Sequence, residues 1–345
     1  MGQHTLAAGV LVKAESTYGT DASPSTSTDG VRFVERPEWK PGFLFDGKRD
    51  KANASNGNVQ RVPPTGRFWE ITHKAHAKGR GAAYTSSSVV VPDIHQLLKA
   101  CGMTATVTTT GGSEKWDFTP DAISPSAATP TSVTMWGYKQ GELMKATGCY
   151  GSFTITADNT GIPVWQFDMK GIGAQNESEV TVGNITYTVP SVMPPTAAGI
   201  TVDLGSSFAP VVRSFKFAMN RTLLPRQDLT SANGHSGFIP SERDPELEIV
   251  FEGAYSGTAG DGYSSSAFGL WDAWRDATTT YSAATLDVNL TIGSTQYNRW
   301  KLLCPQVQLE KFEWRESGAE QLAVCTFRPY LTGENAVDDF TIRFD

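Results

Sequence analysis

The stretch that decides the fold is Phe68-Trp69-Glu70-Ile71-Thr72-His73-Lys74-Ala75, in which apolar and polar side chains alternate. Because successive side chains of a strand point to opposite faces, this pattern predicts a β-strand with one buried face. A glycine- and serine-rich segment follows at 79–88, and an apolar stripe then predicts a short helix over 92–101. Pro92 suits the first turn of that helix, and Gly102 suits its C-terminal end.

The same order of elements recurs in the second half of the chain. Residues 246–252 alternate, a glycine-rich segment spans 257–266, and a second helix is expected over 267–276. The two helical stripes lie at one constant offset and are Ile94, Leu97, Leu98 and Cys101, and Ala267, Leu270, Trp271 and Trp274. This self-similarity predicts an internal duplication.

Each expected helix is followed by two hairpin signals, in which alternating segments flank a short turn. The turns are Gln140-Gly141, 159–161, Gly293-Ser294 and Ser317-Gly318. The flanking strands are expected at 134–138 and 143–147, 152–157 and 164–170, 286–292 and 296–302, and 307–315 and 321–329.

The duplication divides the chain into two modules. The first spans 1–172 and the second 210–345, and a proline-containing linker joins them at 173–209. Two stretches break the symmetry, at 37–66 and 104–131, and both are expected to be long loops.

Composition narrows the class of protein. Among 345 residues, 39% are hydrophobic and 19% charged, as in a globular protein. No apolar run approaches the roughly 18 residues of a membrane span, and no signal peptide is evident at the N-terminus, so we expect synthesis and retention in a cytosol. Scattered basic residues and a formal charge of −7 argue against gripping DNA, although DNA could pass without sticking. The four widely spaced cysteines are expected to be buried thiols.

Residues that could support catalysis or bind metal do not form a recognisable set. His73 and His76 would point to opposite faces of a strand, so surface or interface roles are expected for them. The serines at 86–88 and 264–266 are expected to cap helices, and the acids Asp338-Asp339 to be solvated or to face a channel. No enzyme, catalytic residue, cofactor or metal site is therefore predicted.

Six tryptophans could suggest a platform for sugars, but most lie on faces that are expected to be core. They are Trp69, Trp136, Trp165, Trp271, Trp274 and Trp300. An alternative function, a phage adhesin or carbohydrate-binding β-sandwich module, stays open on this ground.

Several segments resemble siphophage tail tube (major tail) proteins. Leu11-Val12-Lys13-Ala14-Glu15-Ser16-Thr17-Tyr18-Gly19-Thr20-Asp21-Ala22 is similar to their opening, and the helix ending at 97–102 to the helix after their glycine-rich loop. The passages 148–155 and 162–171 resemble their closing hairpin. The resemblance covers most of residues 6–172 in order, whereas 210–345 match only in layout.

The resemblance implies a mainly β fold with two tandem tail-tube-like β-sandwich or barrel modules, each with one short α-helix. Sheets from six such modules would join edge to edge into a ring β-barrel, so three chains would form a pseudo-hexameric ring, with hexamers as the alternative. Stacked rings would make the tail tube of a virion, assembled in the host cytoplasm. DNA would pass through its lumen without specific binding. The implied partners are tail terminator, tape measure and tail-tip proteins, with no membrane.

The long segment 37–66 mixes aromatic and charged residues, which is typical of an interface. Together with the resemblance, this predicts contacts between rings or subunits. The candidate residues are Trp39, Phe43, Phe45, Lys48, Arg49, Asp50 and Arg61.

Overall fold

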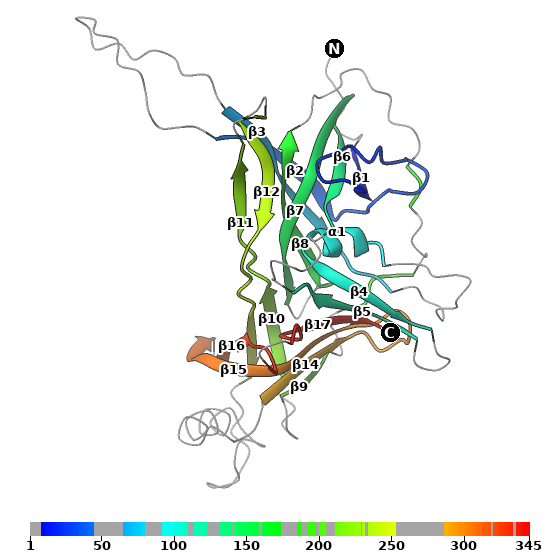
Figure 1. The fold of residues 1–345 in the computed structure, drawn as a ribbon. Coiled ribbons are helices and arrows are strands. Elements are labelled where there is room, and N and C mark those ends of the chain that lie inside the picture. Colours follow the sequence, from blue (N-terminus) through cyan, green and yellow to red (C-terminus); the bar gives the residue numbers. More distant parts are fainter. Residues whose placement is uncertain are drawn as a thin grey trace, which may run out of the picture.

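A computed structural model describes most of the chain. The described residues are 8–44, 65–79, 92–109, 114–122, 131–139, 141–158, 161–173, 185–187, 192–196, 200–204, 211–228, 230–231, 234–252, 286–318, 320–333 and 336–345. This part is mainly β, as predicted, with one helix and a large antiparallel sheet (Figure 1). Within these ranges the sheet does not close into a barrel.

The elements of the first half are β1 (Ala8–Ala14), β2 (Glu35–Leu44), β3 (Thr65–Ala75), α1 (His95–Ala100), β4 (Met103–Thr108), β5 (Lys115–Pro120), β6 (Val133–Lys139), β7 (Glu142–Asp158) and β8 (Val164–Gly173). Those of the second half are β9 (Thr201–Asp203), β10 (Val212–Ala218), β11 (Leu223–Gln227), β12 (His235–Pro240), β13 (Glu246–Glu252), β14 (Leu286–Ile292), β15 (Trp300–Ser317), β16 (Glu320–Pro329) and β17 (Thr341–Phe344).

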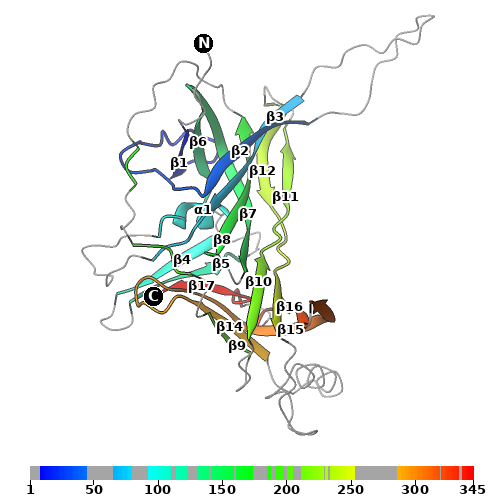
Figure 2. The ribbon, with the colours of Figure 1, turned by 180° about the vertical axis from the view of Figure 1, so that it is seen from behind.

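Two series of six strands pair in the same order. The first runs β2-β3-β8-β7-β6-β1, and the second runs β10-β13-β16-β15-β14-β9, with every pair antiparallel. The two series also share a β-bulge at the corresponding place. The register of the β6·β7 ladder shifts between Val133 and Met135, and that of the β14·β15 ladder shifts between Leu286 and Val288. β10 also pairs with β7, so the two series form one continuous sheet. Figure 2 shows the same arrangement from behind.

Three segments expected to be irregular contain strands. Residues 37–44, expected in a loop, belong to β2, which pairs with β3. The stretch 104–131, also expected as a loop, contains most of the β4–β5 hairpin, and β17 joins that hairpin to β15. The expected linker 173–209 contains β9, which pairs with β14. The prolines and threonines of these segments favoured loops in the sequence analysis. Proline is nevertheless tolerated in strands at sheet edges, where its missing N–H is not needed.

The helix in the first half is confirmed, although it is shorter than predicted. It spans His95–Ala100, and the stripe Ile94, Leu97, Leu98 and Cys101 is fully buried. Gly102 ends it with φ +77°, and a Cβ there would overlap the Arg221 guanidinium, which donates to the Cys101 carbonyl at 2.8 Å. The second expected helix, 267–276, and both serine clusters lie outside the described residues.

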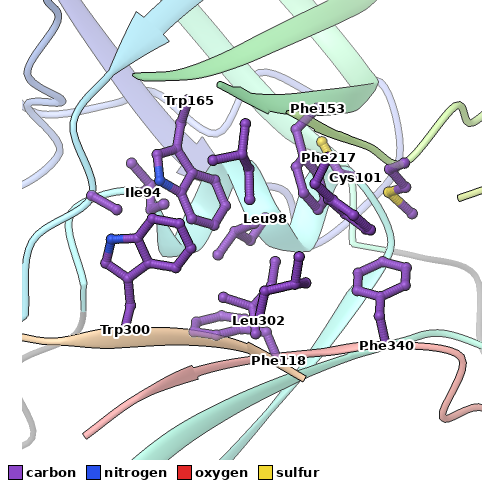
Figure 3. Close-up of a cluster of buried hydrophobic side chains, with 14 of the residues drawn as sticks. Ile94, Leu98, Cys101, Phe118, Phe153, Trp165, Phe217, Trp300, Leu302 and Phe340 are labelled. Atoms are coloured by element: carbon purple, nitrogen blue, oxygen red, sulfur yellow. The ribbon is translucent and has the colours of Figure 1, made fainter. Parts of the chain in front are cut away.

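The core draws side chains from both halves of the chain (Figure 3). Trp165 of β8 and Trp300 of β15 are fully buried, with ring centroids 5.0 Å apart. Phe217 of β10 packs on Phe153 of β7 at 6.0 Å and on Phe340 at 4.9 Å. These two tryptophans are core residues, as expected, and the halves are joined by packing as well as by strand pairing.

Asp339 corrects the expectation of a solvated or channel-facing acid. Asp339 is buried and accepts from Arg243, with Nε to Oδ2 at 2.8 Å and Nη2 to Oδ1 at 3.1 Å. The third nitrogen of the Arg243 guanidinium, Nη1, donates to the Asp121 carbonyl at 2.8 Å. A buried charge needs such a partner. Because Arg243 bonds to both Asp339 and the Asp121 carbonyl, it links the C-terminal segment to the first half.

His73 corrects a second expectation, because it is fully buried rather than on the surface. Its Nε2 lies 3.1 Å from the Arg32 carbonyl, and burial lowers its pKa to about 4. An unfolded histidine binds a proton below about pH 6.5, whereas the folded one does so only below about 4. The folded state therefore loses stability as the pH falls across that window.

We expect His73→Gln to reduce this loss. Between pH 7 and pH 4.5, the free energy of unfolding should fall by about 2 kcal/mol less in the variant than in the wild type. Urea titrations at both pH values measure the difference. Equal losses in the two proteins would contradict the assignment. His95, whose pKa burial also lowers to about 4, and His235, whose pKa burial lowers as well, contribute to the loss that remains.

Candidate subunit-assembly edges

The joint between β7 and β10 shows how one series of strands attaches to the other. Ser214 to Ala218 of β10 lie antiparallel to Thr154 to Asp158 of β7, and Phe217 faces Ile155. Beyond that ladder, the Met219 N–H donates to the Phe153 carbonyl at 3.0 Å. The side chains of Phe217 and Ile155 are fully buried, so the joint combines backbone bonds with apolar packing.

Strand β15 carries an edge that resembles the docking edge of β7. Its first part pairs with β14 as far as Val307, and residues 307–317 pair with β16 on the opposite side. Among the described strands, none pairs with the β14 side of β15 beyond Val307. The end of the β15–β16 hairpin projects sideways near the lower end of the molecule, to the left in Figure 1 and to the right in Figure 2.

Strand β2 provides the second open edge. It pairs with β3 on one side, and within the described ranges no strand covers its other side. An unpaired edge is a template for another chain, and proteins weaken unwanted pairing with charge and proline. β2 carries both, with Pro37 and Pro41 along the strand and Glu38 and Lys40 between them.

Charged side chains follow both open edges on the polar face of the sheet. Glu38 and Lys40 are exposed and form an ion pair at 2.8 Å, and Lys311 and Glu313 do the same at 2.8 Å. The hydrogen bond from Lys40 lowers the pKa of Glu38, and the Glu313 contact raises the pKa of Lys311. Such exposed pairs are weak, so these side chains can exchange partners easily.

The structure places two of the predicted contact residues. Trp39 lies on β2, packs partly against the core and meets Trp69 edge-on with ring centroids 5.6 Å apart. Phe43 lies near the end of β2 and is 43% exposed. The others, Phe45, Lys48, Arg49, Asp50 and Arg61, lie outside the described residues. Sequence reasoning missed Glu38, Lys40, Glu313 and Arg315, whose signal was alternating charge along a strand.

In the part of the chain that the structure describes, neither the four thiols nor the side chains of metal-binding type form a reactive site. All four cysteines are buried, as predicted, and burial raises the pKa of each. Within the same ranges, no three His, Cys, Asp or Glu side chains gather as a metal site would require. No described helix has both the length and the apolar character to cross a membrane.

Comparison with known proteins adds no relative. No family model matches the chain, and no curated protein matches it. The described residues define a mainly β protein whose two strand series are joined where β10 pairs with β7. Among the described strands, β2 has a neighbour on one side only, and so has β15 beyond Val307.

Proposed function

We propose that the chain is a structural subunit of a bacteriophage tail tube, with two tail-tube-like units in one polypeptide. Three chains form a pseudo-hexameric ring in a virion, and the rings stack into a channel for DNA. Assembly takes place in the host cytoplasm. Tail terminator, tape measure and tail-tip proteins are the partners at the ends and in the lumen.

One observation carries this proposal: the docking of β10 on β7. Each strand series begins with an equivalent strand, β2 or β10, and contains one long strand, β7 or β15, with a docking edge. Inside the chain, β10 fills the edge of β7, which leaves β2 and the far part of β15 as a matching pair. Two different edges that match each other make a heterologous contact, and repeated heterologous contacts close into rings.

The polar face of the sheet suits a channel that releases DNA. It carries threonines together with acids and bases of interleaved sign, including ion pairs between Lys170 and Glu70 at 2.8 Å and between Lys74 and Glu35 at 2.7 Å. A surface that grips nucleic acid instead clusters its lysines and arginines. This face, directed to the lumen, would let DNA slide past with little retention.

The β2–β3 hairpin suits a contact between rings. Residues 45–64 connect the two strands, and exposed Phe43 lies at the start of that connection. A long segment that combines aromatic and charged residues buries surface when it docks on a neighbouring ring. The predicted contacts of Phe45, Lys48, Arg49, Asp50 and Arg61 belong to this segment.

Electron microscopy of purified protein tests the proposal. We expect the concentrated wild type to form hollow tubes of constant diameter. A matched variant replaces residues 45–64 by Asn-Gly, a turn that fits because Leu44 and Thr65 face each other across the hairpin. This variant should fold normally by circular dichroism and give single rings that do not stack.

Two other results would contradict parts of the proposal. Discrete particles of the wild type under every condition, together with glycan binding, would favour the adhesin or carbohydrate-binding module instead. Normal tubes from the shortened variant would leave the ring proposal intact and remove the inter-ring role of residues 45–64.

A further inference from the structure

We infer that β2 of one copy pairs with β15 of the next copy in a single register, with Glu38 opposite Arg315 and Lys40 opposite Glu313. The inference rests on the proposed function, and it names the contact that closes the ring. It follows from reading the β10·β7 joint as a template for the joint between copies.

Corresponding bulges align the two strand series. Val133, at the bulge of β6, faces Cys149 in β7, and Leu286, at the bulge of β14, faces Val307 in β15. Cys149 and Val307 therefore hold equivalent positions. A shared bulge is a stronger anchor than sequence similarity because it fixes a geometric irregularity of the ladder.

The alignment extends across β7 to β8 and across β15 to β16. Gly171 of β8 packs closely on Cys149, and Pro329 of β16 faces Val307. Trp165 and Ala323 lie six positions before these two residues and are therefore equivalent. Trp165 faces Ile155 of β7, whereas Ala323 faces Trp314 of β15. The distance along β15 is one residue longer than along β7 because β15 has a further bulge between Leu309 and Lys311.

The other neighbours of β8 and β16 align the edge strands. Trp165 faces Ala75 of β3, and Ala323 faces Phe251 of β13. The residues four positions earlier in β3 and β13 face Trp39 of β2 and Phe217 of β10, respectively. Trp39 and Phe217 are therefore equivalent.

The register between copies follows directly. Within the chain, Phe217 faces Ile155. Their equivalents are Trp39 and Trp314, so these two tryptophans face each other across the joint between copies. Antiparallel pairing then places each neighbour of Trp39 opposite a neighbour of Trp314 on the polar face of the sheet.

Charge complementarity supports this register independently of the alignment. It sets the acid Glu38 against the base Arg315, and the base Lys40 against the acid Glu313. A slip by two residues breaks both matches in either direction. One slip sets Glu38 against Glu313 and Lys40 against Lys311, and the other leaves Glu38 opposite Ser317 and sets Lys40 against Arg315. Opposite charges directly across an antiparallel ladder are favourable, and like charges are unfavourable.

The β7·β10 joint within the chain lacks such matched pairs. At the corresponding positions, Lys216 faces Thr156 and Ala218 faces Thr154. A joint inside one chain needs no selection between partners, whereas a joint between copies does. Matched charges provide that selection and speed the encounter of two copies.

The prolines of β2 make the side chains more important. The Met219 bond shows that alternate residues of β10 point their polar groups at β7, and the equivalent outward positions of β2 include Pro37 and Pro41. Trp39 and Trp314 can exchange two backbone bonds, while each proline can only accept one. Backbone pairing alone is therefore weakened, and other strands are poor substitutes.

Charge exchange tests the register. The variants E38K/K40E and E313K/R315E each place like charges in both pairs, whereas the quadruple variant restores opposite charges in both pairs. We expect either double variant to raise the protein concentration needed for tube formation by about tenfold or more, and the quadruple variant to recover most of that loss. Light scattering and sedimentation velocity measure the threshold.

A charge exchange next to the β7·β10 joint within the chain is the matched control. Lys216 faces Glu248 on the same polar face, on two strands that are already paired on both sides. K216E/E248K therefore exchanges charge without altering the four residues of the tested pairs and should assemble like the wild type. If the wild type assembles and the double variants do too, or if the quadruple variant is not rescued, the register is wrong while the tube function stands. A wild type that never assembles overturns the proposed function itself.

Discussion

Oxidising tubes built from an E38C/R315C variant should convert the chain into covalent multimers that end at three chains. The two positions face each other without mutual backbone bonds, where Cβ atoms lie about 4.5–5.5 Å apart. A disulfide needs about 3.5–4.5 Å, which a small strand movement supplies. The native thiols should not interfere, because all four are buried and burial raises the pKa of each. Lys40 and Glu313 remain to support assembly.

Electrophoresis under non-reducing conditions reads the outcome. A ladder of one, two and three chains, with the largest species resistant to further growth, is the expected pattern of a closed ring of three. The single variants E38C and R315C are the controls and should give monomers. A ladder that ends at six chains would replace the trimer by a hexamer, and an unlimited ladder would indicate an open helix. Intact tubes without any cross-link would refute the register.

Phe217→Ala should lower the free energy of unfolding by about 3–5 kcal/mol. The ring is fully buried at the β10·β7 joint, where it packs on Phe153 and Phe340, so its removal leaves a cavity between the two halves. Chemical denaturation followed by tryptophan fluorescence measures the change, since Trp165 and Trp300 lie in the same core.

The neighbouring residue of β10 supplies a control for this substitution. Lys216 is exposed on the polar face, and Lys216→Ala should change stability by no more than about 0.5 kcal/mol. A cost below about 1 kcal/mol for Phe217→Ala would mean that the site collapses around the missing ring, and that the two halves do not depend on this contact.

Local patterns predicted the local elements well. Strand β13 begins and ends where the alternation of residues 246–252 placed it, and Lys139 pairs with Glu142 on the two sides of the expected β6–β7 turn. The helical stripe in the first half is buried as predicted. These features depend on side-chain periodicity and turn chemistry, which the sequence carries directly.

Other features depended on contacts between distant segments. The strand 115–120 had a usable signal, because Trp116 and Phe118 alternate with polar residues and are buried, yet its threonine-rich surroundings favoured a loop. His73 also shares its strand face with buried Ile71 and Ala75, which predicts its burial. The pairing of β17 with β5 had no local signal at all.

The candidate edges were only partly accessible from sequence. Aromatic and charged residues drew attention to Trp39 and Phe43, but the importance of Glu313 and Arg315 emerges only when β15 is seen to extend past β14. An open edge is a property of topology, because it depends on which strands lie elsewhere. No periodicity reports it.

Because β7 and β10 belong to one chain, the joint between them has a thermodynamic consequence for the proposed ring. Separate molecules lose translational and rotational freedom each time they associate, a cost of several kcal/mol per event. A tether replaces that loss by a high effective concentration, so in the proposed pseudo-hexamer half of the joints would form while each chain folds. Closure of the proposed ring would then require the meeting of three bodies instead of six, and partly built rings should be correspondingly scarce during assembly.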